Sequence, residues 1–289
     1  LMYCRRIKRS VFPAILLSTL AVFILMYDVV AADARSNSGP RLKSRVAIVV
    51  DHTNGEVIYE KNAFDVAPIA SITKLMTAMV IIDSGVPLLE SMTIAKADVD
   101  RYKGSRSKLS VGTTLLRAEV LKLALMASEN RASAALSRVF PGGKEAFVQA
   151  MNEKAKSLGM DQTVFVDSTG LRPGNVSSGL DLVKMAIAAY EYPLIRQYTT
   201  TSSFQLRAKI GSRSVTLEYV NSNRLARSSR WEIGLSKTGY ISESGRCLVM
   251  QTTILGKPVI MVLLDSWGKL TALGDAGRAR RWMERAKKK

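Results

Sequence analysis

The stretch PIASITKLMTAMV, residues 68–80, places a serine three residues before a lysine at the start of an apolar segment. The apolar positions of this segment recur at the spacing of one helix face: Leu75, Met76, Met79 and Val80. Ser71 and Lys74 share a face near the helix amino terminus, where backbone amides stabilise a developing anion. Two interpretations are open: a helix cap beside a solvated lysine, or a nucleophilic serine with a buried lysine as its base.

The second interpretation requires a lysine that has lost its proton. Burial or a neighbouring cation would lower the lysine pKa toward that state. The chain contains one histidine, His52, which we expect to be an exposed residue of a hairpin turn. A histidine-based triad and a zinc site of the His/Cys kind are therefore not expected, and we expect no cofactor and no metal. If the protein is a hydrolase, its base is a lysine or a carboxylate.

The amino terminus has the order of a secretory signal: basic residues, an apolar run at about 11–26, and the small-residue stretch VVAADA ending at Ala34. We expect residues 1–34 to be a signal peptide and residues 35–289 to be one exported, periplasmic domain that is soluble after cleavage. The alternative is a retained membrane anchor, although the apolar run is short for a span of roughly 20 residues. Cys4 lies in the signal, so Cys247 has no disulfide partner in the mature chain.

The formal net charge is +18, and removal of a signal with four basic and two acidic residues leaves +16. This charge suits nucleic acid or an anionic envelope surface. Export excludes most nucleic acid, so no nucleic-acid partner is expected. Association with the envelope surface and a solvated basic surface without a dedicated partner both stay open.

Strand patterns lie at both ends of the mature chain. Residues 45–62, RVAIVVDHTNGEVIYEKN, contain two β-rich runs separated by Asn54-Gly55, which predicts a hairpin. Helical patterns follow at about 72–82, 115–126, 144–158 and 180–190, then strand patterns at 203–220 and 233–265, with turns at Gly211-Ser212 and Gly256-Lys257, and a last helix at about 270–286. We expect an α+β fold in which strands from both ends form one antiparallel sheet, flanked by helices, around an inserted helical lobe. A cleft should lie between the lobes.

Two further segments favour catalysis over the helix cap. LALMASENRASAAL, residues 123–136, places Ser128 and Asn130 just after an apolar helix, and GLSKTGYI, residues 234–241, places Lys237, Thr238 and Gly239 on a strand. The three elements, in this order, resemble the serine-x-x-lysine, serine-x-asparagine and lysine-threonine-glycine motifs of penicillin-binding proteins and serine β-lactamases. With DHTNGEVIYEKNA and FVDSTGL they are similar to the D-alanyl-D-alanine peptidase branch, over about residues 46–284. The resemblance implies a β-lactamase/transpeptidase-like fold.

The resemblance also implies a role for each matching residue. Ser71 would attack the peptide carbonyl and form an acyl-enzyme, Lys74 would accept its proton, and Ser128 would relay a proton to the departing amine. In substrate binding, the amide of Asn130 would hold the peptide oxygen, Lys237 and Thr238 would face the carboxylate beside the scissile bond, and Gly239 would let the substrate lie close to the strand. The backbone amides of Ser71 and Tyr240 would form the oxyanion hole. Lys237 would also help to keep Lys74 neutral by repulsion.

The resemblance leaves two peptidase activities open. No glutamate-x-x-leucine-asparagine loop follows Asn130, which disfavours rapid antibiotic hydrolysis, and Glu129 in place of a common aspartate should not alter the reaction class. The chain after Lys237 completes the sheet and one helix, without the additional domain and anchor of many D,D-carboxypeptidases. KGSRSKLSVG and LLDSWGKLTALGDAGRARRW look more like the small soluble D-alanyl-D-alanine endopeptidases, which cut peptidoglycan cross-links. We therefore expect an endopeptidase that acts on peptidoglycan stem peptides and cross-links and is inhibited covalently by β-lactams. The alternatives are a D-alanyl-D-alanine carboxypeptidase and a non-catalytic basic module that binds the envelope.

Overall fold

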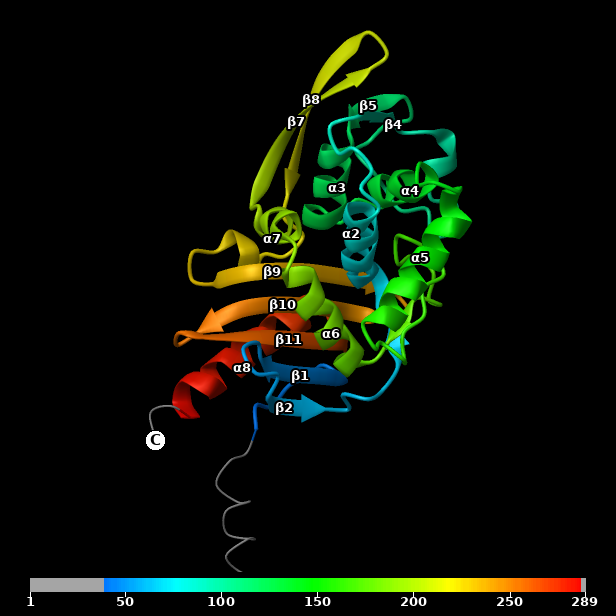
Figure 1. The fold of residues 1–289 in the computed structure, drawn as a ribbon. Helices are drawn as coiled ribbons and strands as arrows, with labels where there is room; N and C mark the ends of the chain where they lie inside the picture. Colours follow the sequence, from blue (N-terminus) through cyan, green and yellow to red (C-terminus); the bar gives the residue numbers. More distant parts are fainter. Residues whose placement is uncertain (1–38, 287–289) are drawn as a thin grey trace, which may run out of the picture. The chain divides into compact units, whose positions relative to one another are not determined.

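The computed structural model describes residues 39–286, so the expected signal peptide lies outside the described residues. The main sheet has five strands in the order β2-β1-β11-β10-β9, and every neighbouring pair is antiparallel (Figure 1). The strands are β1 (Val46–Asp51), β2 (Val57–Lys61), β9 (Glu232–Ile241), β10 (Gly245–Ile254) and β11 (Lys257–Ser266). Strands from both ends of the chain therefore share one sheet, which confirms the expected α+β architecture.

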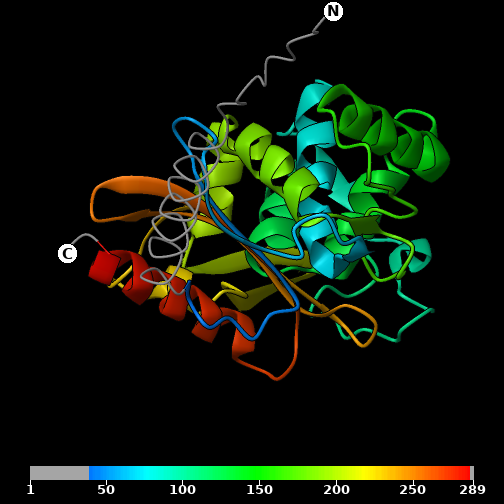
Figure 2. The same ribbon diagram turned by 90° about the horizontal axis from the view of Figure 1, so that it is seen from below.

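Each face of this sheet is covered by a helix. Side chains of a strand alternate between faces, so Ile48 and Val262 pack in one core with α6 (Gly179–Tyr190), while Val49 and Met261 pack in another with α8 (Thr271–Ala286). In Figure 2 the red helix α8 and the green helices of the lobe lie on opposite sides of the strands. Because the central strands are buried on both faces, they read as nearly continuous apolar runs.

The helical lobe is built around α2 (Lys74–Asp83), whose first eight residues are all buried. It is surrounded by α3 (Arg117–Met126), α4 (Asn130–Arg138), α5 (Gly143–Ser157) and α7 (Pro193–Thr200). A 3-10 turn, η1 (Ala70–Thr73), precedes α2, and the 3-10 turns η2 (Lys96–Asp98) and η3 (Leu225–Arg227) lie elsewhere. A helix that is apolar on all sides must be enclosed by other elements, which is why α2 forms the centre of this lobe.

A second sheet corrects the expectation that all strands join the first one. It has the order β4-β5-β7-β8 and comprises β4 (Ser91–Thr93), β5 (Thr113–Leu116), β7 (Ser203–Ile210) and β8 (Arg213–Val220). In β7 only Leu206 and Ala208 are fully buried, and both contact the helical core. A hairpin with one apolar face packs on the helical lobe and cannot occupy the interior of a sheet that is covered on both sides. Two short strands, β3 (Ala67–Pro68) and β6 (Val176–Ser177), pair separately.

Three local expectations were wrong in detail. The helix expected from residue 115 begins at Arg117, because Thr113–Leu116 is strand β5. The turn before β11 is formed by Leu255 and Gly256, both with positive φ, and Lys257 already belongs to the strand. The ring of His52 is half-buried, with its centroid 4.6 Å from that of Tyr190 in an edge-on contact. Among residues 39–286, no helix combines the length and the apolar character needed to cross a membrane.

Candidate active site

The turn that carries Ser71 joins the sheet to the centre of the helical lobe. Ser71 lies in η1, and Lys74 is the first residue of α2 and is completely buried. Nζ of Lys74 lies 2.8 Å from Oγ of Ser71. Lys74 also donates to Oδ1 of Asn130 at 2.8 Å and to the backbone carbonyl of Thr169 at 2.6 Å. Three sequence motifs far apart in the chain therefore contribute to one polar cluster.

These contacts suit a neutral amine on Lys74. A neutral amine has two N–H donors and one lone pair, whereas an ammonium has three donors. The oxygens of Asn130 and Thr169 accept the two donors. The lone pair then faces the hydroxyl of Ser71, which is the geometry that a general base needs to remove its proton.

The surroundings of Lys74 favour that protonation state. Burial lowers the pKa of Lys74 from 10.5 to about 7, although the carboxylates of Asp167 and Glu129 oppose the shift. Burial also lowers the pKa of Lys237, and a positive charge on Lys74, when that amine is protonated, lowers it further. Desolvation is therefore the largest cause of the shift on Lys74, and the expected repulsion by Lys237 stays a prediction.

Ser128 and Lys237 form a second hydroxyl–amine pair in the cluster. Ser128 lies between α3 and α4 with a φ of 59°, a left-handed conformation that is costly for a serine. Nζ of Lys237 donates to Oγ of Ser128 at 2.8 Å and to the carbonyl of Thr238 at 2.9 Å. Lys237 is 1% exposed. The structure thus places Lys237 behind Ser128, and of the two residues expected to face a substrate carboxylate only Thr238 lines the pocket.

Two glycines, one in β9 and one in the loop at 167–172, pack closely against the turn that carries Ser71. A Cβ on Gly239 would lie 3.0 Å from the backbone nitrogen of Ser71, and a Cβ on Gly170 would lie 1.8 Å from the carbonyl oxygen of Ala70. Ala70 has a φ of 46°, so the turn itself is strained. Gly239 is therefore required for the approach of the protein's own turn to β9, and its expected role toward the substrate stays a prediction.

The loop at residues 167–172 positions the carbonyl that binds Lys74. Oδ1 of Asp167 accepts hydrogen bonds from the backbone N–H groups of Thr169 and Gly170, at 2.5 and 2.7 Å. The hydroxyls of Thr77 and Ser133 donate to the carbonyl of Ser168, at 2.7 and 2.5 Å. In the sequence this loop, FVDSTGL, carries only a family likeness, and its contact with Lys74 was not expected.

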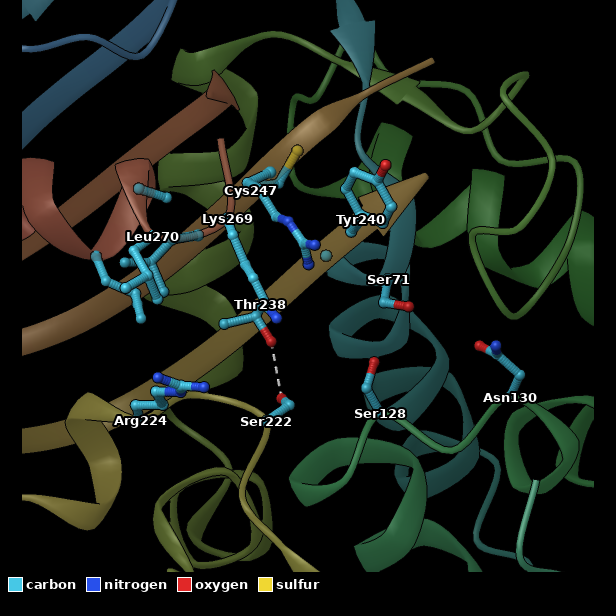
Figure 3. A pocket seen from close by; sticks show the side chains of 15 residues that line it. Ser71, Ser128, Asn130, Ser222, Arg224, Thr238, Tyr240, Cys247, Lys269 and Leu270 are labelled. Carbon is cyan, nitrogen blue, oxygen red and sulfur yellow. Dashed lines mark hydrogen bonds between the residues drawn. The ribbon is translucent and has the colours of Figure 1, made fainter. Parts of the chain in front are cut away.

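These groups open into a pocket of about 380 Å³. Figure 3 shows Ser71, Ser128 and Asn130 toward one end of it, Arg224, Lys269 and Leu270 toward the other, and Thr238 between. Of the residues predicted for the site, those that line the pocket are Ser71, Ser128, Asn130, Thr238, Gly239 and Tyr240. The hydroxyl of Thr238 donates to Oγ of Ser222 at 2.8 Å. Ser222 and Arg224 were missed because no quoted segment contains them, and Lys269 lies in LLDSWGKLTALGDAGRARRW, a stretch that gave no role to the lysine.

A second cavity adjoins the first at Asn130. Its volume is about 880 Å³, and Asn130 belongs to the lining of both cavities. The second cavity lies over the segment 96–102, helices α4 and α5, and the loop at 166–172. A ligand that reaches the Ser71 hydroxyl can therefore extend in two directions.

Comparisons with known proteins give the family. Residues 33–268 match the model of peptidase family S11, described as D-alanyl-D-alanine carboxypeptidase. The chain is 47% identical over 243 residues to the D-alanyl-D-alanine endopeptidase of Pseudomonas aeruginosa, covering 84% of this chain and 78% of the relative. It is 44% identical over 256 residues to the D-alanyl-D-alanine endopeptidase of Escherichia coli, covering 89% and 82%.

A solved structure agrees with this assignment. The fold is similar to that of the Streptomyces K15 DD-transpeptidase, with a TM-score of 0.80 and 26% identity over 85% of this chain and 98% of that one. The likeness covers both the sheet and the helical lobe, as the resemblance in the sequence implied. The family match, the relatives and the Ser71–Lys74 geometry agree, and the chain belongs to peptidase family S11 of serine D-alanyl-D-alanine peptidases.

Proposed function

We propose that this protein is a D-alanyl-D-alanine endopeptidase that hydrolyses D-alanyl-diaminopimelate cross-links of peptidoglycan through an acyl-enzyme on Ser71. The observation that carries the proposal is the 2.8 Å distance between Nζ of the buried Lys74 and Oγ of Ser71. The choice of endopeptidase is supported by the names of the relatives at 47% and 44% identity.

The proposed reaction begins with attack on the D-alanyl carbonyl. Oγ of Ser71 forms a bond to the carbonyl carbon as Lys74 takes the hydroxyl proton, and the backbone amides of Ser71 and Tyr240 stabilise the oxyanion. The carbon–nitrogen bond then breaks as Ser128, paired with Lys237, relays the proton held by Lys74 to the departing amine, so Lys74 is neutral again. Water hydrolyses the resulting ester and restores Ser71.

The two cavities suit a substrate with chain on both sides of the cleaved bond. Thr238 faces the carboxylate beside the departing amine, so the leaving group extends past Thr238 toward Arg224 and Lys269. The acyl part extends past Asn130 into the larger cavity. In a D-alanyl-diaminopimelate cross-link the departing amine sits on a D-configured centre that bears a carboxylate, so Thr238 would bind it as it would bind a terminal D-alanine.

A D-alanyl-D-alanine carboxypeptidase is the second candidate. It is supported by the description of the family and by 32% identity over 242 residues to the D-alanyl-D-alanine carboxypeptidase DacF of Bacillus subtilis. The same site would then release a terminal D-alanine. The chain covers 61% of that relative, compared with 82% of the Escherichia coli endopeptidase.

The location that we propose is the periplasm. It is supported by the signal-like order of residues 1–34 and by the peptidoglycan substrate. The net charge of +18 also favours contact with an anionic envelope surface, and binding to isolated anionic envelope at low and high salt tests this. Covalent inhibition by β-lactams is expected on Ser71.

Products from defined peptidoglycan fragments distinguish the two activities. A cross-linked dimer and a monomeric pentapeptide are supplied at matched concentrations, each product is followed by mass, and Ser71→Ala serves as the blank. We expect the dimer to be split to monomers faster than the pentapeptide loses D-alanine. If D-alanine release dominates while dimers persist, the endopeptidase proposal is wrong and the carboxypeptidase candidate replaces it.

A further inference from the structure

The catalytic pocket has a strongly positive lining. Three cationic side chains line it, those of Arg224, Arg246 and Lys269, and no aspartate or glutamate is among its lining residues. Within residues 39–286, none of the three makes an ion pair with a carboxylate. Uncompensated positive charge in a concave site attracts anionic ligands.

The three cations are not equivalent. The guanidinium of Arg246 lies 3.9 Å from the centroid of the Tyr240 ring, so this side chain is held against an aromatic face. Arg224 and Lys269 are exposed and come from separate elements, the segment before η3 and the loop between β11 and α8. In Figure 3 both lie on the side of Thr238 that is away from Asn130, and the chain of Lys269 extends toward Thr238. We call this pair, Arg224 and Lys269, the basic rim.

The basic rim lies where the leaving group departs in the proposed function, on which this inference rests. A released D-alanine carries one carboxylate, and Thr238 faces it. The leaving part of a cross-link carries that same carboxylate on the D-configured centre, and further carboxylates along the acceptor stem peptide. A single leaving residue has one carboxylate, which faces Thr238, so it gives no reason for two further cations. The two cations match the additional carboxylates of a longer acidic peptide.

We propose that the basic rim is a subsite for a second carboxylate on the leaving stem peptide, which makes the enzyme prefer cross-linked substrates with a free acidic acceptor stem. Guanidinium and ammonium groups bind carboxylates through charge-assisted hydrogen bonds. Because both side chains are exposed, solvent weakens each pair, and we expect each cation to contribute about fivefold or less to kcat/KM. The contribution should decrease with added salt, as it does for exposed charges.

The test uses two cross-linked dimers that differ only in the acceptor stem. One has free carboxylates beyond the one beside the cleaved bond, and in the other these carboxylates are amidated. At low salt, we expect the wild type to have a higher kcat/KM for the free dimer, and Arg224→Gln and Lys269→Gln each to reduce this preference by about fivefold or less. The double variant should cleave both dimers equally well.

Arg227→Gln is the matched control, because Arg227 is an exposed arginine three residues from Arg224 that does not line the pocket. It should keep the full preference, and penicillin labelling of every variant reports that its site is folded. If the wild type splits both dimers at equal rates, or if Arg224→Gln and Arg227→Gln behave alike, the subsite is refuted while the endopeptidase function stands. If no dimer is split and only D-alanine is released, the proposed function fails and the subsite fails with it.

Discussion

Asp167 fixes the loop whose Thr169 carbonyl accepts a hydrogen bond from Lys74, and its negative charge also reaches Lys74. Its Oδ1 accepts from the backbone N–H of Thr169 at 2.5 Å, and Nζ of Lys74 donates to the Thr169 carbonyl at 2.6 Å. The charge of Asp167 raises the pKa of Lys74 against the larger effect of burial, which lowers it to about 7. The pKa of Lys74 is thus set by two opposing effects, desolvation and a nearby carboxylate.

A pH dependence follows from this balance. Lys74 must be neutral to accept the proton of Ser71, so acylation by penicillin should be fast above a pH of about 7 and should fall as the pH drops below it. Asp167→Asn removes a charge that raises the pKa of Lys74, so this acidic limb should move to lower pH. Stopped-flow acylation between pH 5 and 9 measures the acidic limb of the wild type and of Asp167→Asn. Asp161→Asn, which changes an exposed aspartate outside both cavities, is the control. A limb that stays in place in Asp167→Asn would contradict the charge effect.

Lys74→Arg keeps the positive charge but should lose acylation by about a thousandfold or more, because a guanidinium does not deprotonate in proteins and general-base catalysis contributes about 10²–10⁴. The rate of penicillin labelling measures the loss, and circular dichroism monitors the fold. Lys156→Arg, on the exposed side of α5, is the control and should label at the rate of the wild type. Normal labelling of Lys74→Arg would show that Lys74 is not the base.

Gly170→Ala should damage both stability and catalysis. The φ of Gly170 is 78°, and the new Cβ would lie 1.8 Å from the carbonyl oxygen of Ala70, so the turn that carries Ser71 must shift. Gly211→Ala is the control for backbone strain alone. Gly211 has a φ of 59° and open space around the added carbon, so this variant is strained but displaces no neighbouring turn. Both variants should lose roughly 1–2 kcal/mol of stability to the left-handed conformation, measured by urea unfolding. Only Gly170→Ala should also lose acylation, and equal acylation rates in the two variants would contradict the role of Gly170.

Cys247 should be inert in the folded protein although it lines the catalytic pocket. Burial raises the pKa of its thiol to about 11, so the thiol is protonated at neutral pH, and the thiol is the less reactive form. Iodoacetamide at pH 7.5 should leave the native protein unmodified and should alkylate Cys247 once urea unfolds the chain, as followed by mass. Rapid alkylation of the native protein would show that the thiol is accessible and ionised.

The sequence predicted the elements that follow strong local patterns. The Asn54-Gly55 hairpin and the apolar runs of β10 and β11 have simple signals, and the main sheet agreed with them. The helix expected from residue 115 included Leu115 and Leu116 of strand β5, because this strand is short and joins α3 directly. The place of β7 and β8 depends on which surface covers their one apolar face, and that surface is set by tertiary packing.

The candidate site also divides into residues that local motifs predict and contacts that depend on tertiary packing. Ser71, Lys74, Ser128, Asn130 and Lys237 come from motifs, and the structure brings their side chains into one cluster. The surroundings of each side chain could not be predicted from the neighbouring sequence. That Lys237 lies behind Ser128, that Gly170 packs against Ala70, and that Arg224 and Lys269 share a pocket all depend on residues distant in the chain.

The most direct test of the account is the location of the penicilloyl adduct. The protein is incubated with penicillin, digested, and mapped by tandem mass spectrometry, with Ser71→Ala treated in the same way. We predict one adduct on Ser71 and none on the variant. An adduct on another residue, or labelling that survives Ser71→Ala, would contradict the assignment of Ser71 as the nucleophile.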